Sequence, residues 1–220
     1  AEDLRTAKEK ASEFAGSGDL NPWVSWPMIA SPRHRGVWLS SRDSDSLGVI
    51  DLYVDSASTR RRVTFARGDD LLGDVSPDGT RAVISTARWN KDSHYDLAIV
   101  SLADGKATAV TQGDDTDAHA HWSHAGDRIA FVRRSWVDDS AGICIVNPDG
   151  SDLSCPQRWR GVGHLVGWID EHHLALTVND GNSLDVVVAD DRATPEYLGQ
   201  FLKEEITKIT GFFDRQECGY

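Results

Sequence analysis

The sequence predicts an all-β fold, a β-propeller with four visible blades, because similar text recurs along the chain at a nearly constant interval. The most regular copy is residues 71–86, LLGDVSPDGTRAVIST, in which Ser76 begins a turn that a strand follows. Related text begins at Ser31, Ser123 and Trp168, so successive copies are 45, 47 and 45 residues apart. Ser-Pro-Asp-Gly is a tight-turn sequence, since proline presets φ and glycine accepts a positive φ.

A second marker lies one strand later in each copy and keeps the same period. It begins at Asp51, Asp96, Gly142 and Asp185, at intervals of 45, 46 and 43 residues. Self-similarity at about 40 to 50 residues is typical of stacked supersecondary units. Because each unit contains short strands and turns, the period indicates propeller blades in place of a helical array.

The repeats are preceded by residues 1–27, which we expect to form a helix and an extended segment. Apolar residues recur at three- and four-residue steps over residues 1–16, which predicts a short amphipathic helix. Residues 21–27, NPWVSWP, hold two tryptophans between prolines and are expected to be extended and packed on the propeller.

The four predicted repeats span residues 28–68, 69–113, 114–160 and 161–200. In the first repeat, strands are expected near residues 36–40, 49–55 and 60–65. In the second, they are expected near residues 73–75, 81–86, 95–102 and 107–111. In the fourth, they are expected near residues 164–168, 173–178 and 184–190. The middle strands of the second repeat are almost continuously apolar, as expected for strands covered by neighbouring blades on both sides.

Beyond Thr194 two interpretations remain open. Pro195 can begin a helix with an apolar face that includes Leu198, Leu202 and Ile206. Alternatively, residues 196–201 form the outer strand of the fourth blade, and residues 201–220 supply a closing strand. The register of the repeat favours the strand.

The net charge of −12 excludes partners that need a positive surface. Phosphates of nucleic acid and anionic membranes would be repelled, so we expect no nucleic-acid partner. No apolar run is long enough for a transmembrane helix, and no signal segment is present. The chain begins with Ala1, and its one methionine is Met28, which indicates either a removed leader or a trimmed chain. A removed leader would place the protein outside the cytoplasm, in the periplasm, cell envelope or medium.

Three cysteines allow one disulfide and leave one cysteine over. In ICIVNPDGSDLSC, a two-residue Asp149-Gly150 turn would place Cys144 directly opposite Cys155 on paired strands. Such a hydrogen-bonded pair has Cα atoms about 5.5 Å apart, within the range that a disulfide tolerates. The alternatives are that both cysteines are buried thiols, or that Cys218 forms a disulfide with one of them.

Two segments resemble the repeats of TolB-type β-propellers. They are Thr64–Thr86, TFARGDDLLGDVSPDGTRAVIST, and Thr111–Val132, TQGDDTDAHAHWSHAGDRIAFV. The resemblance covers about residues 28–200. It implies a propeller fold, found in envelope scaffolds, in substrate gates of peptidases and in metal-dependent lyases.

The resemblance also raises the question of how the ring closes, because this family usually has six blades and four are visible here. Closure with four blades is known but uncommon, so residues 1–27 and 201–220, or a further chain, are the candidates to complete the ring. An open edge strand would invite pairing with a partner.

Propeller topology sorts the loops onto two faces. The tight Asp-Gly turns gather on one face, and the long polar loops gather on the other, where function is expected. On this second face His119 and His164 occupy equivalent positions four residues before their repeat marks, at the entrance of neighbouring inner strands. His121 is expected on the same side of its strand as His119.

These histidines and a nearby acidic loop form a candidate site for a divalent metal ion. The loop carries Asp114, Asp115 and Asp117. Imidazole suits zinc, manganese or iron, and the carboxylates add negative charge. His119-Ala120-His121 with Gln112 also resembles the inner-strand metal ligands of oligogalacturonate-lyase propellers. The alternative is that the histidines are hydrogen-bonded channel lining.

Trp89 and Trp136 each lie thirteen residues after their repeat mark, in equivalent loops on the same face. They would form an aromatic platform for a sugar ring or for a side chain of a partner protein. Alternatively, each folds over the edge of its own blade.

These patterns lead to one expected function and two alternatives. The expected function is a non-enzymatic, exported scaffold or assembly component that binds another protein and needs no cofactor. The alternatives are a metal-dependent, lyase-like enzyme on acidic sugars and a carbohydrate-binding propeller lectin. The sequence contains no Gly-x-Ser-x-Gly, Walker or His-Glu-x-x-His motif, which weighs against a peptidase.

Overall fold

A computed structural model describes residues 28–31, 37–43, 49–89, 94–135, 137, 140–159, 162–179, 184–190 and 195–196. All regular secondary structure in these ranges is β-strand. The predicted N-terminal helix and the residues beyond Glu196 lie outside the described residues.

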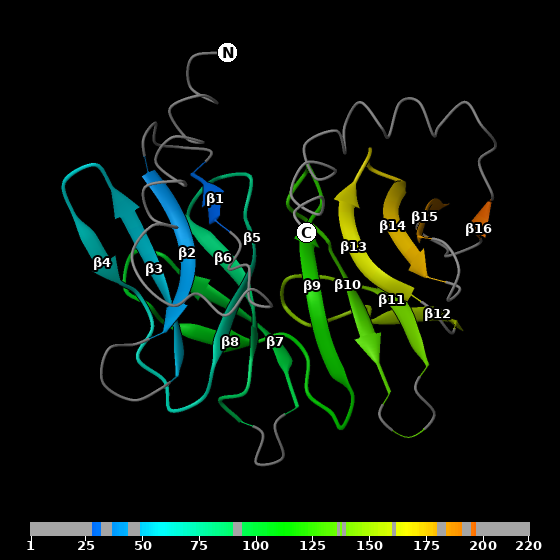
Figure 1. The fold of residues 1–220 in the computed structure, drawn as a ribbon, viewed down its shortest axis with the longest axis horizontal. Coiled ribbons are helices and arrows are strands. Elements are labelled where there is room, and N and C mark those ends of the chain that lie inside the picture. Colours follow the sequence, from blue (N-terminus) through cyan, green and yellow to red (C-terminus); the bar gives the residue numbers. More distant parts are fainter. Residues whose placement is uncertain are drawn as a thin grey trace, which may run out of the picture.

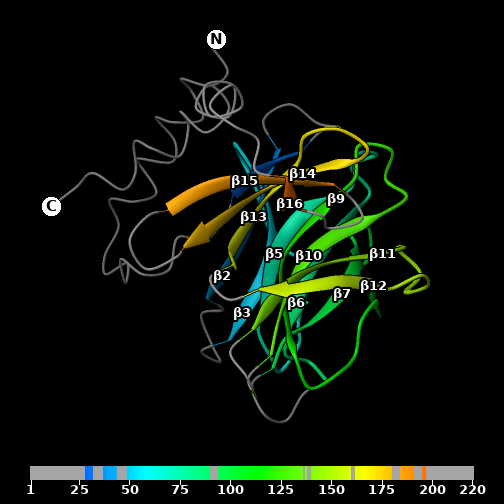
Figure 2. The same ribbon diagram turned by 90° about the vertical axis from the view of Figure 1, so that its right-hand side faces the viewer.

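The strands form four sheets of four antiparallel strands, each sheet in simple sequential order (Figures 1 and 2). The first sheet contains β1 (Met28–Ala30), β2 (Val37–Asp43), β3 (Ile50–Ser56) and β4 (Arg60–Arg62). The second contains β5 (Asp70–Val75), β6 (Arg81–Thr86), β7 (Asp96–Ser101) and β8 (Ala107–Ala109). The third contains β9 (Thr116–Trp122), β10 (Ile129–Arg134), β11 (Ala141–Val146) and β12 (Ser154–Trp159). The fourth contains β13 (Val162–Trp168), β14 (His173–Asn179), β15 (Leu184–Asp190) and β16 (Pro195–Glu196).

The predicted all-β propeller architecture is confirmed, and each sheet lies within one of the predicted repeats. Strand β6 has the bounds that the turn chemistry of Ser76–Thr80 predicts. Ser76 fixes that turn, because its hydroxyl donates to Asp78 Oδ1 and its carbonyl accepts from the Gly79 amide. At the end of the described chain, β16 pairs with β15, so Pro195 begins a strand.

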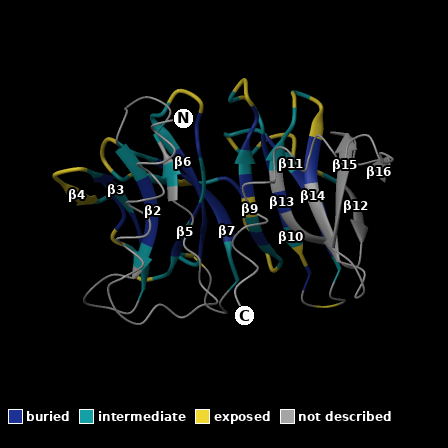
Figure 3. Cartoon of the chain, turned by 45° about the horizontal axis from the view of Figure 1, so that its top comes forward, coloured by how far each residue is buried: buried dark blue, intermediate teal, exposed yellow. Residues whose placement is uncertain are grey.

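Neighbouring sheets pack through three apolar clusters, one at each junction. Leu39 and Leu52 of the first sheet pack with Ile84 of the second. The second junction contains Leu97, Ile99, Phe131 and Cys144, among others. The third includes Val132, Ile143, Leu165 and Leu174. The second and third sheets are therefore covered on both sides, while the first and fourth sheets lie at opposite ends of the row (Figure 3).

An arginine–tryptophan contact joins the second sheet to the third, and an equivalent contact joins the third sheet to the fourth. The guanidinium of Arg81 lies 4.8 Å from the ring centre of Trp122, and that of Arg128 lies 4.9 Å from the ring centre of Trp168. Trp168 Nε1 also donates to the carbonyl oxygen of His121. These cation–π contacts hold the inner strand of one blade against the start of the second strand of the preceding blade, at Arg81 in β6 and at Arg128 directly before β10.

The first sheet differs from the others on the face that points away from the second sheet. In the second sheet, the positions that face the preceding sheet are aliphatic: Ala82, Ile84, Ala98 and Val100. The register of strands β2 and β3 puts Trp38, Ser40, Tyr53 and Asp55 at the equivalent positions. Asp55 accepts hydrogen bonds from Ser40, Arg42 and Arg60. At these positions the first sheet therefore carries aromatic and salt-bridged side chains in place of aliphatic ones.

Candidate functional site

The long connections of the first three blades lie at one end of the sheets, which we call the loop face. Among the described residues it consists of 63–69, 87–89 with 94–95, 110–115, and 135 with 137 and 140. The tight turns that link the first and second strands of the blades, such as 76–80 and 123–128, lie at the other end. The antiparallel order of each sheet requires this separation, as the sequence predicts.

Three large apolar side chains are exposed on the loop face. Phe65, Trp89 and Val137 expose 72%, 44% and 96% of their surface. Among the described residues, the fourth exposed large apolar side chain is Leu153, in the turn before β12. Because all three lie in connections at the same end of the sheets, where binding residues of such folds are often found, we take this end as the candidate binding surface. The predicted platform also includes Trp136, which lies outside the described residues, so the pairing of the two tryptophans stays a prediction.

At the same end of the sheets, two equivalent arginine–aspartate pairs hold the ends of the inner strands. Arg88 donates to both carboxylate oxygens of Asp70, with Nε 2.8 Å from Oδ1. Arg133 donates to both oxygens of Asp117, at 2.7 and 2.8 Å. Both carboxylates are buried, and the two-bond geometry fixes each arginine. The hydrogen bonds that Arg133 donates to Asp117 also raise the pKa of the Arg133 guanidinium.

The three aspartates predicted in one loop have different positions. Asp114 is exposed and Asp115 is half-buried in the loop before β9. Asp117 lies within β9, where Arg133 compensates its charge, and not in the loop. This carboxylate is therefore committed to an ion pair, which sequence reasoning missed. The recurrence of arginine at positions 88 and 133, 45 residues apart, was the available signal.

A tyrosine–aspartate hydrogen bond joins the connections around the second blade. Tyr95 donates its hydroxyl to Asp69 Oδ2 at 3.1 Å, and Asp69 Oδ1 accepts from the amide of Ile50 in the first blade. The amide of Asp117 in the third blade donates to the Tyr95 carbonyl oxygen. Burial, followed by the nearby charge of Asp69, raises the pKa of Tyr95 to about 12. Three blades are thus linked through this one segment of the loop face.

The inner strand that carries the predicted histidine ligands is irregular. Its pairing with β10 shifts by one residue between Ala118 and His121, and His119 within that bulge has a φ of 53°. His119 is exposed in the middle of β9 and not at its entrance. The prediction that His119 and His121 lie on the same side of β9 rests on simple alternation of side chains, and this bulge interrupts the alternation. The register of β13 shifts between Val162 and Leu165, so His164 lies at the corresponding irregularity, but its side chain is outside the described part.

His121 lies between the inner strands of three blades. Its Nε2 is 3.2 Å from the carbonyl oxygen of Leu165, and its Nδ1 is 3.7 Å from Asp74 Oδ2. Asp74 also accepts a hydrogen bond from the amide of Trp122. These contacts fit the alternative interpretation of His121 as a hydrogen-bonded residue of the channel lining.

The described side chains do not supply a metal centre. Among them, no three histidine, cysteine, aspartate or glutamate side chains gather into a group that could hold a metal ion. Asp117 is paired with Arg133, and His121 faces a backbone carbonyl. The metal site of His119, His121 and His164 therefore stays a prediction.

Cys144 and Cys155 form a disulfide, with Cα atoms 4.2 Å apart. The expected two-residue turn is wrong, because the turn spans Asn147 to Ser151, with the Asn147 amide donating to the Ser151 carbonyl oxygen. The strands nevertheless pair Ile145 with Ser154 after a register shift, which leaves Cys144 opposite Cys155. Cys218 lies outside the described residues.

No helix able to span a membrane occurs in the described part of the chain. No family model matches the sequence, and no curated protein matches it. Solved structures match its fold. TolB from Acinetobacter baumannii superposes with a TM-score of 0.65 at 14% identity, over 78% of this chain and 42% of that one. A protein described as TolB from Agrobacterium tumefaciens gives 0.62 at 18%, over 74% and 60%.

Oligogalacturonate lyase from Vibrio parahaemolyticus gives a TM-score of 0.59 at 11% identity, over 80% of this chain and 53% of that one. This chain thus covers between 42% and 60% of the length of these three proteins. Identity this low shows the fold alone, and the shared fold is that of a propeller.

Proposed function

We propose that this TolB-type β-propeller is a non-enzymatic scaffold that binds another protein through its loop face. The observation that carries the proposal is the exposure of Phe65, Trp89 and Val137 on one face. Binding energy in protein interfaces concentrates in a few aromatic and apolar anchors surrounded by polar groups. Asp114 and Asp115 lie in another connection of the same face and add acidic groups to it.

Hydrogen bonds among the described residues of this face support the same function. Arg88 and Arg133 are each held by two hydrogen bonds to a buried carboxylate, and Tyr95 links the connections of three blades. A surface that is ordered before binding loses little conformational entropy on association. The exposed anchors therefore stand on a preorganised base.

The proposed location is outside the cytoplasm. Disulfides persist in oxidising compartments, and the Cys144–Cys155 bond fits a periplasmic, envelope or secreted protein. The net charge of −12 adds electrostatic attraction for a basic partner.

The test compares binding by surface variants in an envelope extract of the source organism. The triple variant Phe65→Ser, Trp89→Ser and Val137→Ser should lose the protein that copurifies with the wild type. The matched control is Leu153→Ser, because Leu153 exposes 44% of its surface, as Trp89 does, but lies in a turn outside the loop face. Equal loss in both variants, with both correctly folded, would contradict binding through the loop face.

Two further measurements separate this proposal from its alternatives. Stoichiometric transition metal in the purified protein, together with cleavage of an acidic polysaccharide, would establish the enzyme and refute the scaffold. Binding to a glycan array that Trp89→Ala abolishes would establish the lectin. Under the proposal, neither result is obtained.

A further inference from the structure

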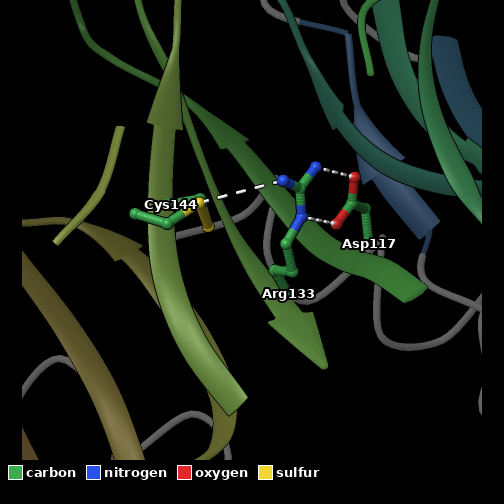
Figure 4. The surroundings of a disulfide bond; sticks show 4 residues. Asp117, Arg133 and Cys144 are labelled. Atoms are coloured by element: carbon green, nitrogen blue, oxygen red, sulfur yellow. Dashed lines mark hydrogen bonds and ion pairs between the residues drawn. A yellow bond between two sulfur atoms is a disulfide. The ribbon is translucent and has the colours of Figure 1, made fainter. Parts of the chain in front are cut away.

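One nitrogen of Arg133 faces the disulfide while the other two hold Asp117 (Figure 4). Nε and Nη2 donate to the Asp117 carboxylate, and Nη1 lies 4.0 Å from the sulfur of Cys155. The guanidinium is a planar fork with donors on separate edges, so it can serve both groups at once. A fixed positive charge therefore lies beside one of the two cysteines.

The two sulfur atoms have different surroundings. Cys144 is completely buried in the apolar cluster that also contains Phe131 and Val146. Cys155 is only partly buried at the edge of that cluster, on the outer strand β12. A positive charge favours a thiolate, and an apolar environment disfavours one. After reduction, Cys155 would be the more reactive thiol, and Cys144 would remain protonated.

We propose that Cys144 and Cys155 form a thiol–disulfide exchange site, in which Cys155 is the nucleophile and Cys144 the resolving thiol. The co-reactant is a small disulfide, R–S–S–R. The Cys155 thiolate attacks one sulfur, which forms a Cys155–S–S–R bond and releases one thiolate, RS⁻. The Cys144 sulfur then attacks Cys155 Sγ, displaces the second RS⁻, and passes its proton to a departing thiolate. Two protein thiols are oxidised while one small disulfide is reduced to two thiols.

Arg133 is a positioning residue in this scheme, because it acts through the charge that it places beside Cys155. Asp117 opposes that effect, since its carboxylate neutralises part of the guanidinium charge. The two residues thus have opposite expected influences on the thiol. A purely structural role of the ion pair would instead make both substitutions act in the same direction.

The experiment measures mixed-disulfide formation with oxidised glutathione, by mass spectrometry, on reduced protein that also carries Cys218→Ser. The variant Cys144→Ser leaves Cys155 as the single thiol, and Cys155→Ser leaves Cys144. Each native rate is divided by the rate of the same variant in concentrated urea. We expect Cys155 to react at least about tenfold faster than Cys144 at neutral pH, since one unit in thiol acidity changes the thiolate fraction tenfold.

Substitutions of the ion pair then test the origin of the difference. In the Cys144→Ser background, Arg133→Met should slow Cys155 several-fold, whereas Asp117→Asn should leave its rate unchanged or raise it. Arg88→Met removes the equivalent arginine in the second blade and should have no effect. The proposal is overturned if Cys144 reacts as fast as Cys155, or if Arg133→Met and Asp117→Asn slow Cys155 equally. If Arg133→Met does not fold, the ratio of the Cys155 rate to the Cys144 rate still tests the proposal.

Discussion

Gly105, at a φ of 73°, lies directly against the backbone of Val63, so that a Cβ atom at position 105 would overlap the Val63 carbonyl oxygen. Gly105 belongs to the outer turn of the second blade, and Val63 follows the outer strand of the first. The same arrangement recurs between Gly150 and Val110 in the next pair of blades. The close approach of neighbouring blades at these two places thus requires glycine, which has no Cβ atom.

Gly105→Ala should lower the free energy of unfolding by about 3 kcal/mol, because it adds overlap with Val63 to the strain of a positive φ. Gly126→Ala is the matched control. Gly126 has a φ of 74°, but its nearest neighbour, Pro77, would be 3.4 Å from the new Cβ. We expect Gly126→Ala to lower the free energy of unfolding by about 1 kcal/mol, which corresponds to the strain of the positive φ alone. Urea unfolding of both variants measures the difference, and equal losses would contradict the contact.

Asp117→Ala should lower the free energy of unfolding by about 3 kcal/mol, since it leaves the largely buried Arg133 without its partner. Replacing both residues, with Asp117→Ala and Arg133→Met, should recover part of the loss. The control is Glu171→Ala, which removes a partly exposed ion pair 3.8 Å long and should cost less than about 1 kcal/mol. Urea unfolding measures all three, and a double variant that is less stable than Asp117→Ala would count against the ion-pair account.

The sequence predicts the strands well where local turn chemistry and the repeat agree. Residues 81–86 form the predicted strand because the Ser-Pro-Asp-Gly turn determines where it begins and the apolar run determines its length. The fold class follows from the period, since each unit needs a neighbour to cover its apolar face.

The site is less predictable because its geometry depends on contacts between distant residues. The bulge at His119 alters the alternation of side chains, and no local pattern in the sequence signals it. Asp117 looks like a free loop carboxylate until the register of β9 and β10 places Arg133 beside it. The exposure of Phe65 does not follow from the sequence, which predicts a strand near residues 60–65, whereas β4 ends at Arg62.

Tyr95 should ionise late in an alkaline titration. Its folded-state pKa is about 12, raised from 10.0 first by burial and then by the charge of Asp69. A raised tyrosine pKa contributes stability that is fully present below pH 10 and is lost as the pH rises towards 12. The phenolate absorbance should show a step near pH 12 that Tyr95→Phe removes. Tyr53→Phe, the control, should retain the step, and a wild-type titration that is complete by pH 11 would contradict the prediction.

Asp78 should make the stability of the second blade sensitive to acid. The hydroxyl of Ser76, followed by the amide and hydroxyl of Thr80, lowers the Asp78 pKa from 3.8 to about 2. Because the folded-state pKa is depressed, the associated stability is present above pH 4 and is lost as the pH falls towards 2. Asp78→Asn removes the titrating group, so its free energy of unfolding should fall less steeply than that of the wild type over this range.

The control for Asp78 is Asp114→Asn, which makes the same substitution at an exposed position in the loop before β9, outside this turn. Urea unfolding at several pH values between 2 and 6 measures the slopes. The hydroxyl of Ser76 donates to Asp78 while the amide of Arg81 donates to that same hydroxyl, so protonation of Asp78 acts on the turn that begins β6. If Asp78→Asn and the wild type have the same slope, the acid sensitivity of the stability arises outside this turn.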